Sequence, residues 1–309
     1  YLIDDVIGLV APSPSAQKER PMMLSQRSSN FARSSSVPTP FSRSRRICTS
    51  IVLERMKLDM KHQGKVAVVT GGVRDIGRAI SLRLAAEGAK VVVNYHGSHD
   101  LAQETLDEIT SAGGEAILFK GDMTSPEDVQ ALVAKTTDSF GSAIDILVNV
   151  AGGLVARKTI DEMDLEFFNQ VMALNLTSTF LVTKAVVPYM SAGGAIVNFS
   201  SQAGRDGGGP GACAYATSKG RVMTFTRAMA KELGPKSIRV NSLCCGMIST
   251  RFHDQFSKPE GRKLVAGNTP LRREGAPDEV ADTVSFLASS EAGYVSGINM
   301  DVNGGLVFS

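Results

Sequence analysis

The sequence lacks the long apolar run that a membrane-spanning helix requires. No window holds the roughly 18 consecutive apolar residues needed, because the longest apolar stretches of this 309-residue chain are interrupted by glycine, asparagine or charged residues. Hydrophobic residues still make up 43% of the chain, which is enough for a sizeable core. We therefore expect a soluble protein with no membrane partner, built as one large or two small domains.

Cysteine is also scarce, with four residues, Cys48, Cys213, Cys244 and Cys245. No pair of them has the spacing of metal ligands, so we expect no metal site. The vicinal pair Cys244-Cys245 is poorly suited to a disulfide. This pattern favours free thiols in a reducing compartment.

Positive charge is concentrated in one N-terminal segment and is not in excess elsewhere. Residues 18–50 contain six arginines and one lysine against a single glutamate, a net charge of +6, whereas the whole chain carries +2. The other residues therefore carry −4. They show no basic stripe of the kind that contacts phosphate backbones, which argues against nucleic acid as a partner.

Residues 1–60 differ in composition from the rest of the chain. The stretch SQRSSNFARSSSVPTPFSRSRRICTS is rich in Ser and Arg and has no apolar periodicity, so we expect a disordered or targeting extension. Two origins stay open. A transit peptide starting near Met22 or Met23 would send the protein to a mitochondrion or plastid, whereas a non-native extension ahead of Met56 or Met60 would leave it cytoplasmic.

From residue 61 onward, apolar runs alternate with helical patterns. Most runs are continuous and rich in Val and Ile, as in parallel strands covered on both faces. Helix signals lie between them, such as the N-cap Ser125 followed by Pro126, and the terminating Gly88. The alternation predicts one doubly wound α/β domain of Rossmann type over residues 61–309 with a seven-stranded parallel sheet. The expected strands are 65–70, 90–95, 116–120, 144–148, 195–200, 238–243 and 299–302.

The segment VAVVTGGVRDIGRAI, residues 66–80, joins the first expected strand to the first helix. Glycines follow the strand end at Thr70, and Gly77 lies near the helix start, so backbone N–H groups are offered to a phosphate. The spacing is not G-x-G-x-x-G, and a tight turn without a ligand is the alternative. The carboxylate of Asp75 within this loop is unexpected, because it repels phosphate.

A second group of polar residues follows near the middle of the chain. Tyr215 and Lys219 are four residues apart in the helical pattern AYATSKGRVMTF, which places them on one helix face. An ammonium beside a phenol lowers the pKa of the phenol toward the range of a general acid or base. Ser200 and Ser201 end the strand AIVNFSS, at the sheet edge where open α/β folds bind ligands. A Tyr-x-x-x-Lys pair alone is common in ordinary amphipathic helices.

Taken together, these blocks resemble the short-chain dehydrogenase/reductase family over about residues 62–309. In chain order they are TGGVRDIG, GDMT, NVAGG, LNLTSTF, the serine strand, YATSK, IRVNSLCCGMIST and SGINMDVNGG. The stretch TPLRREGAPDEVADTVSFLASSEAGYVSG is most similar to the branch with bacterial 3-oxoacyl-ACP reductases and many sugar and polyol dehydrogenases. The resemblance implies an NAD(P)-dependent oxidoreductase for a small carbonyl or alcohol substrate. It also implies a homo-oligomer, usually a tetramer.

The resemblance implies catalytic roles for four side chains. Tyr215 would give a proton to the substrate carbonyl oxygen during reduction, and Lys219 would lower the pKa of Tyr215 and hold the nicotinamide ribose. Ser201 would hydrogen-bond the same oxygen. Successive strand residues face opposite sides, so only one of Ser200 and Ser201 can point inward, and the second serine matches the family pattern. Asn175 would hold the water that links Lys219 to solvent; the alternative is an asparagine that bonds the helix backbone.

The resemblance also predicts the cofactor site. NAD-preferring relatives carry an acidic residue after the second strand, where Asn94, Tyr95 and His96 offer no carboxylate. Arg74 can pair with a 2′-phosphate, so NADP(H) is favoured and NAD(H) is the alternative. Asp75 replaces the family's middle glycine and is expected to cap the following helix, turned away from the phosphates. The other expected cofactor-binding residues are Gly71, Ile76, Gly77, Asp122, Met123, Asn149, Ala151, Gly152, Tyr215, Lys219, Gly246, Ile248 and Thr250.

The sequence thus predicts an NADPH-dependent carbonyl reductase that interconverts a ketone and a secondary alcohol, similar to 3-oxoacyl-ACP reductases. One alternative is a sugar, polyol or sugar-acid oxidoreductase of the same family. Another is a non-catalytic NADP-binding sensor or scaffold, which would have no need of all four catalytic side chains. The substrate loop is expected over residues 251–269, where basic side chains either meet an acidic substrate or face solvent.

Overall fold

The structure is a computed structural model that describes residues 60–308. The expected N-terminal extension, residues 1–60, lies outside the described residues except for Met60. Cys48 lies outside them too, whereas Cys213, Cys244 and Cys245 are free thiols in the structure. The disordered or targeting role of the extension therefore stays a prediction.

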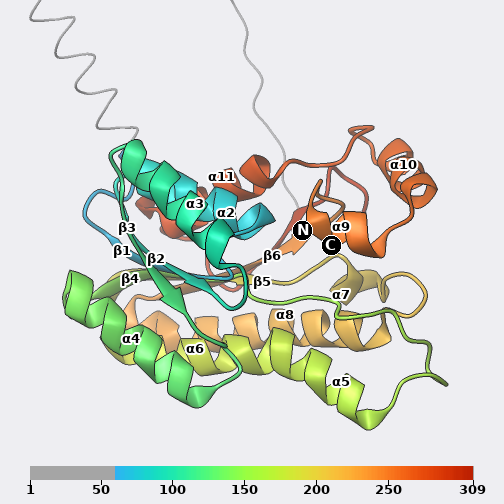
Figure 1. The fold of residues 1–309 in the computed structure, drawn as a ribbon, viewed down its shortest axis with the longest axis horizontal. Helices are drawn as coiled ribbons and strands as arrows, with labels where there is room; N and C mark the ends of the chain where they lie inside the picture. Colours follow the sequence, from blue (N-terminus) through green and yellow to red (C-terminus); the bar gives the residue numbers. More distant parts are fainter. Residues whose placement is uncertain (1–59, 309) are drawn as a thin grey trace, which may run out of the picture. The chain divides into compact units, whose positions relative to one another are not determined.

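Seven parallel strands form one sheet in the order β3-β2-β1-β4-β5-β6-β7 (Figure 1). This confirms the expected doubly wound Rossmann-type fold. Because β1 lies between β2 and β4, the strand order reverses at β1, and the carboxyl ends of these strands flank a natural binding crevice. The strands are β1 (Val66–Thr70), β2 (Lys90–Tyr95), β3 (Glu115–Lys120), β4 (Ile144–Asn149), β5 (Met190–Phe199), β6 (Arg239–Cys245) and β7 (Asn299–Val302).

Helices cover both faces of the sheet (Figure 1). On one face lie α2 (Asp75–Ala86), α3 (His99–Ser111) and α11 (Pro277–Ala288). On the other lie α4 (Pro126–Phe140), α5 (Leu165–Met172), α6 (Ser178–Val186) and α8 (Cys213–Leu233). The shorter helices are η1 (Ala173–Thr177), η2 (Val187–Tyr189), α7 (Ala203–Asp206), η3 (Gly234–Lys236), α9 (Arg251–Phe256), α10 (Pro259–Asn268) and η4 (Ser290–Ala292).

Two hydrophobic cores result from the alternation of side chains along the strands. In β1, Val69 packs into the core shared with α2 and α11, whereas Val68 packs into the core shared with α4 and α6. Both side chains are fully buried, which explains why the strands read as continuous apolar runs. The predicted cap of α4 is confirmed, because the Ser125 hydroxyl accepts a hydrogen bond from the Asp128 N–H at 3.2 Å.

The start of β5 differs most from its expected position. Strand β5 begins at Met190, before the glycine pair Gly193-Gly194 that disfavours a strand in the sequence. It pairs there with Ile144 of β4, and the register shifts before Ile146 pairs with Ala195. Helix α2 begins at Asp75, close to the start expected near Gly77.

One helical segment, Leu165–Tyr189, is long and apolar enough by composition to cross a membrane, with a mean hydropathy of 1.4. Polar residues interrupt it, so it contains no long consecutive apolar run. Half of its most apolar stretch is buried inside the fold. There α5 packs against α8, and α6 packs against α4. The segment therefore has the character of a core helix of this domain.

A buried histidine, His62, lies shortly before β1, at the end of the sheet where this strand begins. The His62 side chain is 1% exposed, and its Nε2 lies 3.3 Å from the Ser285 hydroxyl and 3.4 Å from a Glu87 carboxylate oxygen. The Ser285 hydroxyl also donates to Glu87. Burial lowers the pKa of His62 from 6.5 to about 4, so the imidazole is neutral at pH 7.

We expect His62 to make the fold acid-sensitive. Its pKa is lower in the folded protein than in the unfolded chain, so between pH 6.5 and about 4 the unfolded chain binds the proton first and stability falls as pH falls. Over this whole pH range, the expected loss of unfolding free energy is about 3 kcal/mol. Melting temperatures from pH 7 to 4.5 should fall less steeply in His62→Gln than in wild type. The exposed-histidine control His96→Gln should keep the wild-type slope, and a wild-type slope in His62→Gln would contradict the assignment.

Candidate cofactor and active site

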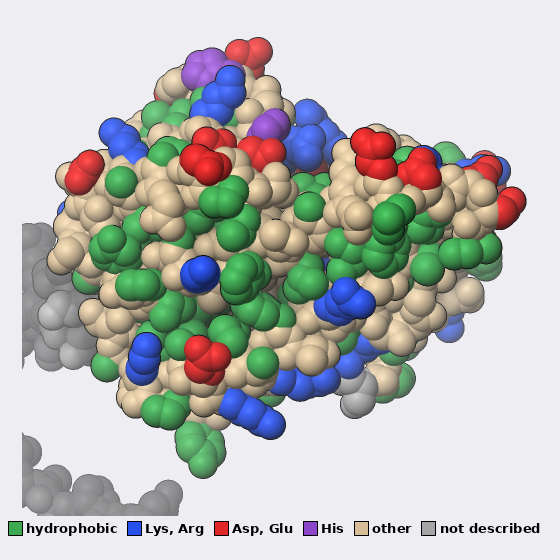
Figure 2. All heavy atoms as spheres, turned by 90° about the horizontal axis from the view of Figure 1, so that it is seen from below, with side chains coloured by type: hydrophobic (Ala, Val, Ile, Leu, Met, Phe, Trp, Pro, Cys, Tyr) green, Lys and Arg blue, Asp and Glu red, His purple; other side chains and the backbone are tan. Residues whose placement is uncertain are grey.

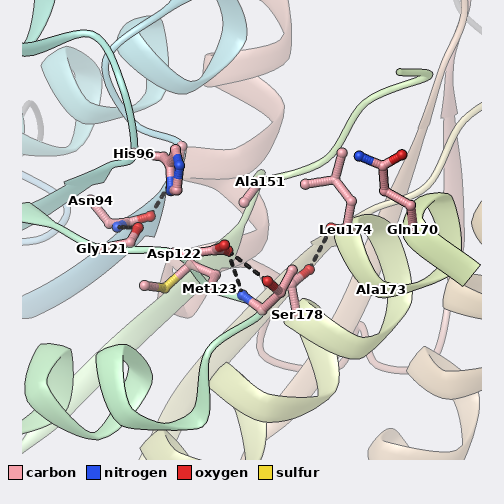
Figure 3. A pocket seen from close by; sticks show the side chains of 12 residues that line it. Asn94, His96, Gly121, Asp122, Met123, Ala151, Gln170, Ala173, Leu174 and Ser178 are labelled. Atoms are coloured by element: carbon pink, nitrogen blue, oxygen red, sulfur yellow. Dashed lines mark hydrogen bonds between the residues drawn. The ribbon is translucent and has the colours of Figure 1, made fainter. Parts of the chain in front are cut away.

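A cavity of about 340 Å³ opens at the carboxyl ends of β1, β2, β3 and β4 (Figure 3). Six expected cofactor-binding residues line it, namely Gly71, Asn94, His96, Asp122, Met123 and Ala151. Sequence reasoning missed six others, namely Gly121, Thr124, Gln170, Ala173, Leu174 and Ser178. The first two of these are the first and last residues of the GDMT block, so that motif could have identified them. The other four come from α5, η1 and α6, whose inward face the sequence pattern does not identify.

The glycine-rich loop is shaped by two close backbone contacts. Gly71 has a φ of +63°, and a Cβ there would lie 3.2 Å from the Ala151 backbone. A Cβ on Gly77 would lie 2.1 Å from the Gly71 carbonyl oxygen. The loop then enters α2, whose first N–H groups donate no hydrogen bond to the side chain of the N-cap residue, Arg74. The N-terminus of this 12-residue helix is therefore available to an anion, and Ile76 lies within its first turn.

Asn94 holds the neighbouring loops together. Its side-chain oxygen accepts a hydrogen bond from the Gly71 N–H at 3.2 Å, and its amide nitrogen donates to the Gly121 carbonyl at 3.0 Å. Tyr95, the next residue, faces the opposite side of β2 and is buried in the core, where its hydroxyl contacts His99 Nδ1 at 2.8 Å. Tyr95 is therefore absent from the cavity lining, whereas His96 is exposed at the cavity.

The loop after β3 is fixed by an acidic side chain. The Asp122 carboxylate accepts hydrogen bonds from the N–H and the hydroxyl of Thr124, each at 2.8 Å. Burial acts to raise the pKa of Asp122, but these hydrogen bonds and the charge of His96 outweigh it and hold the pKa below its usual range. Asp122 is therefore ionised at neutral pH, and Met123 beside it is 4% exposed.

The loop after β4 contains Gly152 and is held in place by Thr70 at the end of β1. The Thr70 hydroxyl accepts hydrogen bonds from the N–H groups of Val150 and Ala151, each at 3.1 Å. A Cβ on Gly152 would lie 2.6 Å from the Asn175 side-chain oxygen and 3.1 Å from Lys219 Nζ. Only glycine therefore lets these two polar groups converge on the loop.

Asn149 points into the structure. Its amide nitrogen donates to the Asn198 side-chain oxygen at 2.9 Å and to the Thr183 hydroxyl at 3.2 Å. Its own side-chain oxygen is buried without a hydrogen-bond partner among the described residues. Asn149 therefore ties β4 to β5 and to α6, and it does not line the cavity.

Asn175 bonds the backbone around it. It lies within the π-helical turn η1, and its amide nitrogen donates to the carbonyls of Gly153 at 2.8 Å and Val171 at 2.9 Å. Its side-chain oxygen accepts from the Gly153 N–H at 3.0 Å. These contacts are those of the alternative left open by the sequence, an asparagine bonded to backbone, although its side-chain oxygen still faces the region of Lys219.

Tyr215, Lys219 and Ser201 meet beside the end of β5. The Ser201 hydroxyl lies near enough to the Tyr215 phenol to lower its pKa, and it accepts a hydrogen bond from the Ala203 N–H at 3.2 Å. The Ser200 hydroxyl instead donates to the Lys219 carbonyl at 2.8 Å. Lys219 Nζ donates to the Phe199 carbonyl at 2.8 Å and lies 5.8 Å from the centre of the Tyr215 ring. Ser201 is thus the one of the two serines that acts on the Tyr215 phenol.

The pKa of Tyr215 differs from the expectation. Burial raises the pKa of Tyr215 to about 12, although the hydrogen bond with Ser201 opposes the shift. Burial likewise lowers the pKa of Lys219 to about 8. The expected lowering of the phenol pKa by the ammonium is therefore wrong for this structure, because loss of hydration outweighs the charge across the 5.8 Å separation.

The expected residues after β6 lie at the same edge of the sheet. A Cβ on Gly246 would lie 2.7 Å from the Asn303 Cβ, so the loop approaches the C-terminal segment closely. Ile248 forms a parallel bridge with Gly275, and the Thr250 hydroxyl donates to the Ile248 carbonyl at 3.1 Å. These residues position α9 and α10, into which the expected substrate loop folds.

Asp75 does not cap α2, contrary to expectation. Helix α2 has Arg74 as its N-cap, and Asp75 is its first residue. The Asp75 side-chain oxygen instead accepts a hydrogen bond from the Arg251 N–H at 3.1 Å. The cause lies in the tertiary fold, because the start of α9 comes next to the glycine-rich loop.

Comparisons with known proteins identify the family of this chain. The family model described as "Enoyl-(Acyl carrier protein) reductase" matches residues 71–307. The chain belongs to the short-chain dehydrogenase/reductase family. A 3-oxoacyl-[acyl-carrier-protein] reductase of Synechocystis is 41% identical over 79% of this chain and 97% of that protein. Glucose 1-dehydrogenase 2 of Bacillus subtilis is 36% identical over 79% of this chain and 95% of that protein.

Solved structures of the same family share the fold. A dehydrogenase/reductase from Sinorhizobium meliloti has a TM-score of 0.78 at 30% identity and covers 82% of this chain and 100% of its own. A short-chain dehydrogenase from Burkholderia cenocepacia, solved in complex with NADP, has a TM-score of 0.75 at 30% identity, covering 80% and 99%. As a short-chain dehydrogenase/reductase, the protein is an NAD(P)-dependent oxidoreductase.

We expect the phenol of Tyr215 to stay neutral in this short-chain dehydrogenase/reductase when no cofactor is added. With a pKa raised to about 12 by burial, it should contribute no phenolate absorbance near 295 nm up to pH 10. The difference between the titrations of wild type and Tyr215→Phe should therefore be flat over that range. Tyr294→Phe, which removes the phenol of a solvent-exposed tyrosine, is the matched control. A phenolate signal lost specifically in Tyr215→Phe below pH 9 would contradict the assignment.

Proposed function

We propose that this enzyme is an NADPH-dependent carbonyl reductase that interconverts a ketone and a secondary alcohol, with a 3-oxoacyl thioester as the preferred substrate class. The observation that carries the proposal is the meeting of the Tyr215 phenol with the Ser201 hydroxyl, with Lys219 beside the ring. A neutral phenol is the acid that a carbonyl oxygen needs during reduction. A non-catalytic scaffold has no use for such a buried proton donor.

The chain's own residues fit a dinucleotide. The N-terminus of α2 and the glycine-rich loop would hold the pyrophosphate, and the cavity between Asn94, Met123 and Leu174 would hold the adenosine. Lys219 and the backbone at Gly152 would hold the nicotinamide ribose, in the region that a glycine keeps open. When bound, the nicotinamide supplies the hydride for the substrate carbon.

Preference for NADP(H) follows from the charges around the cavity. Asn94, Tyr95 and His96 at the end of β2 offer no carboxylate. The exposed side chains of Arg74 and His96 belong to the loops that bound this region. An arginine pairs strongly with a 2′-phosphate and gains little from a ribose hydroxyl. The NADP complex of the Burkholderia relative supports the proposal by analogy.

The chain's residues would act as follows during reduction. The Ser201 hydroxyl would donate a hydrogen bond to the substrate carbonyl oxygen and fix it beside Tyr215. As the carbonyl carbon accepts hydride, the Tyr215 hydroxyl would break its O–H bond and protonate the oxygen, leaving a phenolate. Lys219 would stabilise that phenolate by its charge. In the reverse direction the phenolate would take the proton from the alcohol.

The wall of the substrate site favours an apolar group beside the carbonyl. The Phe252 ring lies 5.9 Å from the Tyr215 ring and 5.1 Å from the Phe256 ring, measured between centroids. These rings suit an acyl chain better than a polyhydroxylated sugar. The similarity to the Synechocystis 3-oxoacyl-ACP reductase also supports an acyl substrate. The similarity to the Bacillus glucose dehydrogenase supports the alternative, a sugar substrate.

We also propose a homo-oligomer for this enzyme, as the family resemblance implies. The helical face on the side of α4, α5, α6 and α8 shows hydrophobic side chains at its surface (Figure 2). Leu165 and Phe180 of this region are 73% and 43% exposed. Clustered exposed apolar side chains of this kind are typical of surfaces that other chains cover. Size-exclusion chromatography with light scattering measures the state directly.

Replacement of Arg74 tests the cofactor preference. Arg74→Ala should raise the KM for NADPH about tenfold or more and leave the KM for NADH within twofold, because only the 2′-phosphate loses a partner. Steady-state assays with each cofactor and a short 3-oxoacyl thioester measure this. Arg78→Ala, an exchange one turn further along the same helix, is the matched control and should change neither value much. Equal effects of Arg74→Ala on both cofactors would refute the assignment.

Replacement of Tyr215 separates catalysis from binding. Tyr215→Phe removes the proton donor and keeps the ring, so kcat should fall at least about 1,000-fold, in keeping with the loss of an acid catalyst. The Kd for NADPH, followed by its fluorescence, should change less than threefold. Tyr294→Phe alters an exposed tyrosine and should leave both quantities unchanged. A wild-type kcat in Tyr215→Phe would contradict the proposed mechanism.

A further inference from the structure

The backbone at Asp75 adopts a conformation that few side chains tolerate. Its φ is +48°, in the left-handed region where Asp and Asn are among the commonest non-glycine residues. An aspartate can therefore replace a glycine there with little strain. Glycine, however, would satisfy the backbone equally well, so the carboxylate needs a separate explanation.

The carboxylate of Asp75 contacts a segment far along the chain. Its Oδ1 accepts a hydrogen bond from the Arg251 N–H at 3.1 Å, across 176 residues of sequence. Arg251 is the first residue of α9. The N-cap of α9 is Thr250, and its hydroxyl donates to the Ile248 carbonyl instead of accepting from the helix. Asp75 therefore supplies from another loop the acceptor that α9 lacks locally.

Helix α9 carries the aromatic wall of the active site. Phe252, which follows Arg251, packs its ring against Tyr215 with centroids 5.9 Å apart, and against Phe256 at 5.1 Å. The far end of α9 is held separately, because the Arg157 guanidinium donates to the Phe256 carbonyl at 3.1 Å. The near end is held by Asp75, and a free near end would let the Phe252 ring leave Tyr215.

We propose, building on the function proposed above, that Asp75 is a positioning residue for substrate binding. Its carboxylate fixes the first turn of α9 and so keeps Phe252 against Tyr215 as one wall of the carbonyl site. Because the Asp75 carboxylate accepts this hydrogen bond from Arg251, it is occupied although it lies in the glycine-rich loop. The loop expected to bind the pyrophosphate and the helix expected to contact the substrate are thereby joined through one side chain.

Two variants at the same position isolate the hydrogen bond. Asp75→Gly keeps the left-handed backbone and removes the acceptor, whereas Asp75→Asn keeps both the backbone preference and a side-chain oxygen and removes only the charge. Melting temperatures establish that both variants are folded. Any difference between them then reports the contact with Arg251.

The first measurement is limited trypsin digestion of the full chain without cofactor. The segment from Arg251 to Arg273 contains several arginines and lysines, and fragment masses identify cuts within it. We expect Asp75→Gly to be cut there at least fivefold faster than wild type, and Asp75→Asn within twofold of wild type. Equal cutting of all three proteins, or equally fast cutting of both variants, would overturn the proposal.

The second measurement is the split between KM and kcat. With a short 3-oxoacyl thioester and saturating NADPH, Asp75→Gly should raise the substrate KM at least fivefold with a smaller change in kcat, and Asp75→Asn should restore it. An unchanged KM alongside faster cutting would refute a positioning role. Absence of turnover in wild type would refute the proposed substrate class instead, and the trypsin comparison would still decide whether Asp75 holds α9.

Discussion

Buried amide and hydroxyl side chains at the carboxyl ends of the strands hold the loops after β1, β3 and β4. Leaving such groups unpaired in the interior is costly, so each one dictates where the adjacent backbone lies. Asn94 holds Gly71 and Gly121 together, and Thr70 holds the loop that leads to Gly152. The sheet is thus both the hydrophobic core of the domain and the template on which the cofactor loops are bonded.

Burial also determines the protonation of Tyr215 and Lys219, the two residues proposed to be catalytic. It pushes the pKa of Tyr215 up to about 12 and that of Lys219 down to about 8, so both shifts favour the neutral form of the group. A phenol that holds its proton suits donation to a carbonyl oxygen. A less strongly protonated lysine can exchange its proton near neutral pH. The same low-polarity setting that packs α8 against the sheet therefore keeps the tyrosine protonated.

Much of the fold was predictable from the sequence, because parallel strands buried on both faces leave continuous Val and Ile runs. The preference for Ser201 over Ser200 came from the family pattern, because strand alternation alone says only that one of the two points inward. What the sequence could not give depends on distant segments. The partner of Asp75 lies 176 residues away, and the turn of Tyr95 toward His99 depends on how α3 packs. The pKa of Tyr215 depends on burial, which a motif does not encode.

The π-helical turn at Ala173–Thr177 has a consequence for how this chain tolerates changes in length. A π turn takes up one more residue than an α-helical turn, so removing one residue there would restore a regular helix. Each α-helical residue corresponds to about 100° of rotation, so α5 would turn by roughly that angle relative to α6. Gln170 and Leu174 would then leave the cavity wall. Insertions and deletions are therefore compatible with the surface loops but not with this stretch of helix.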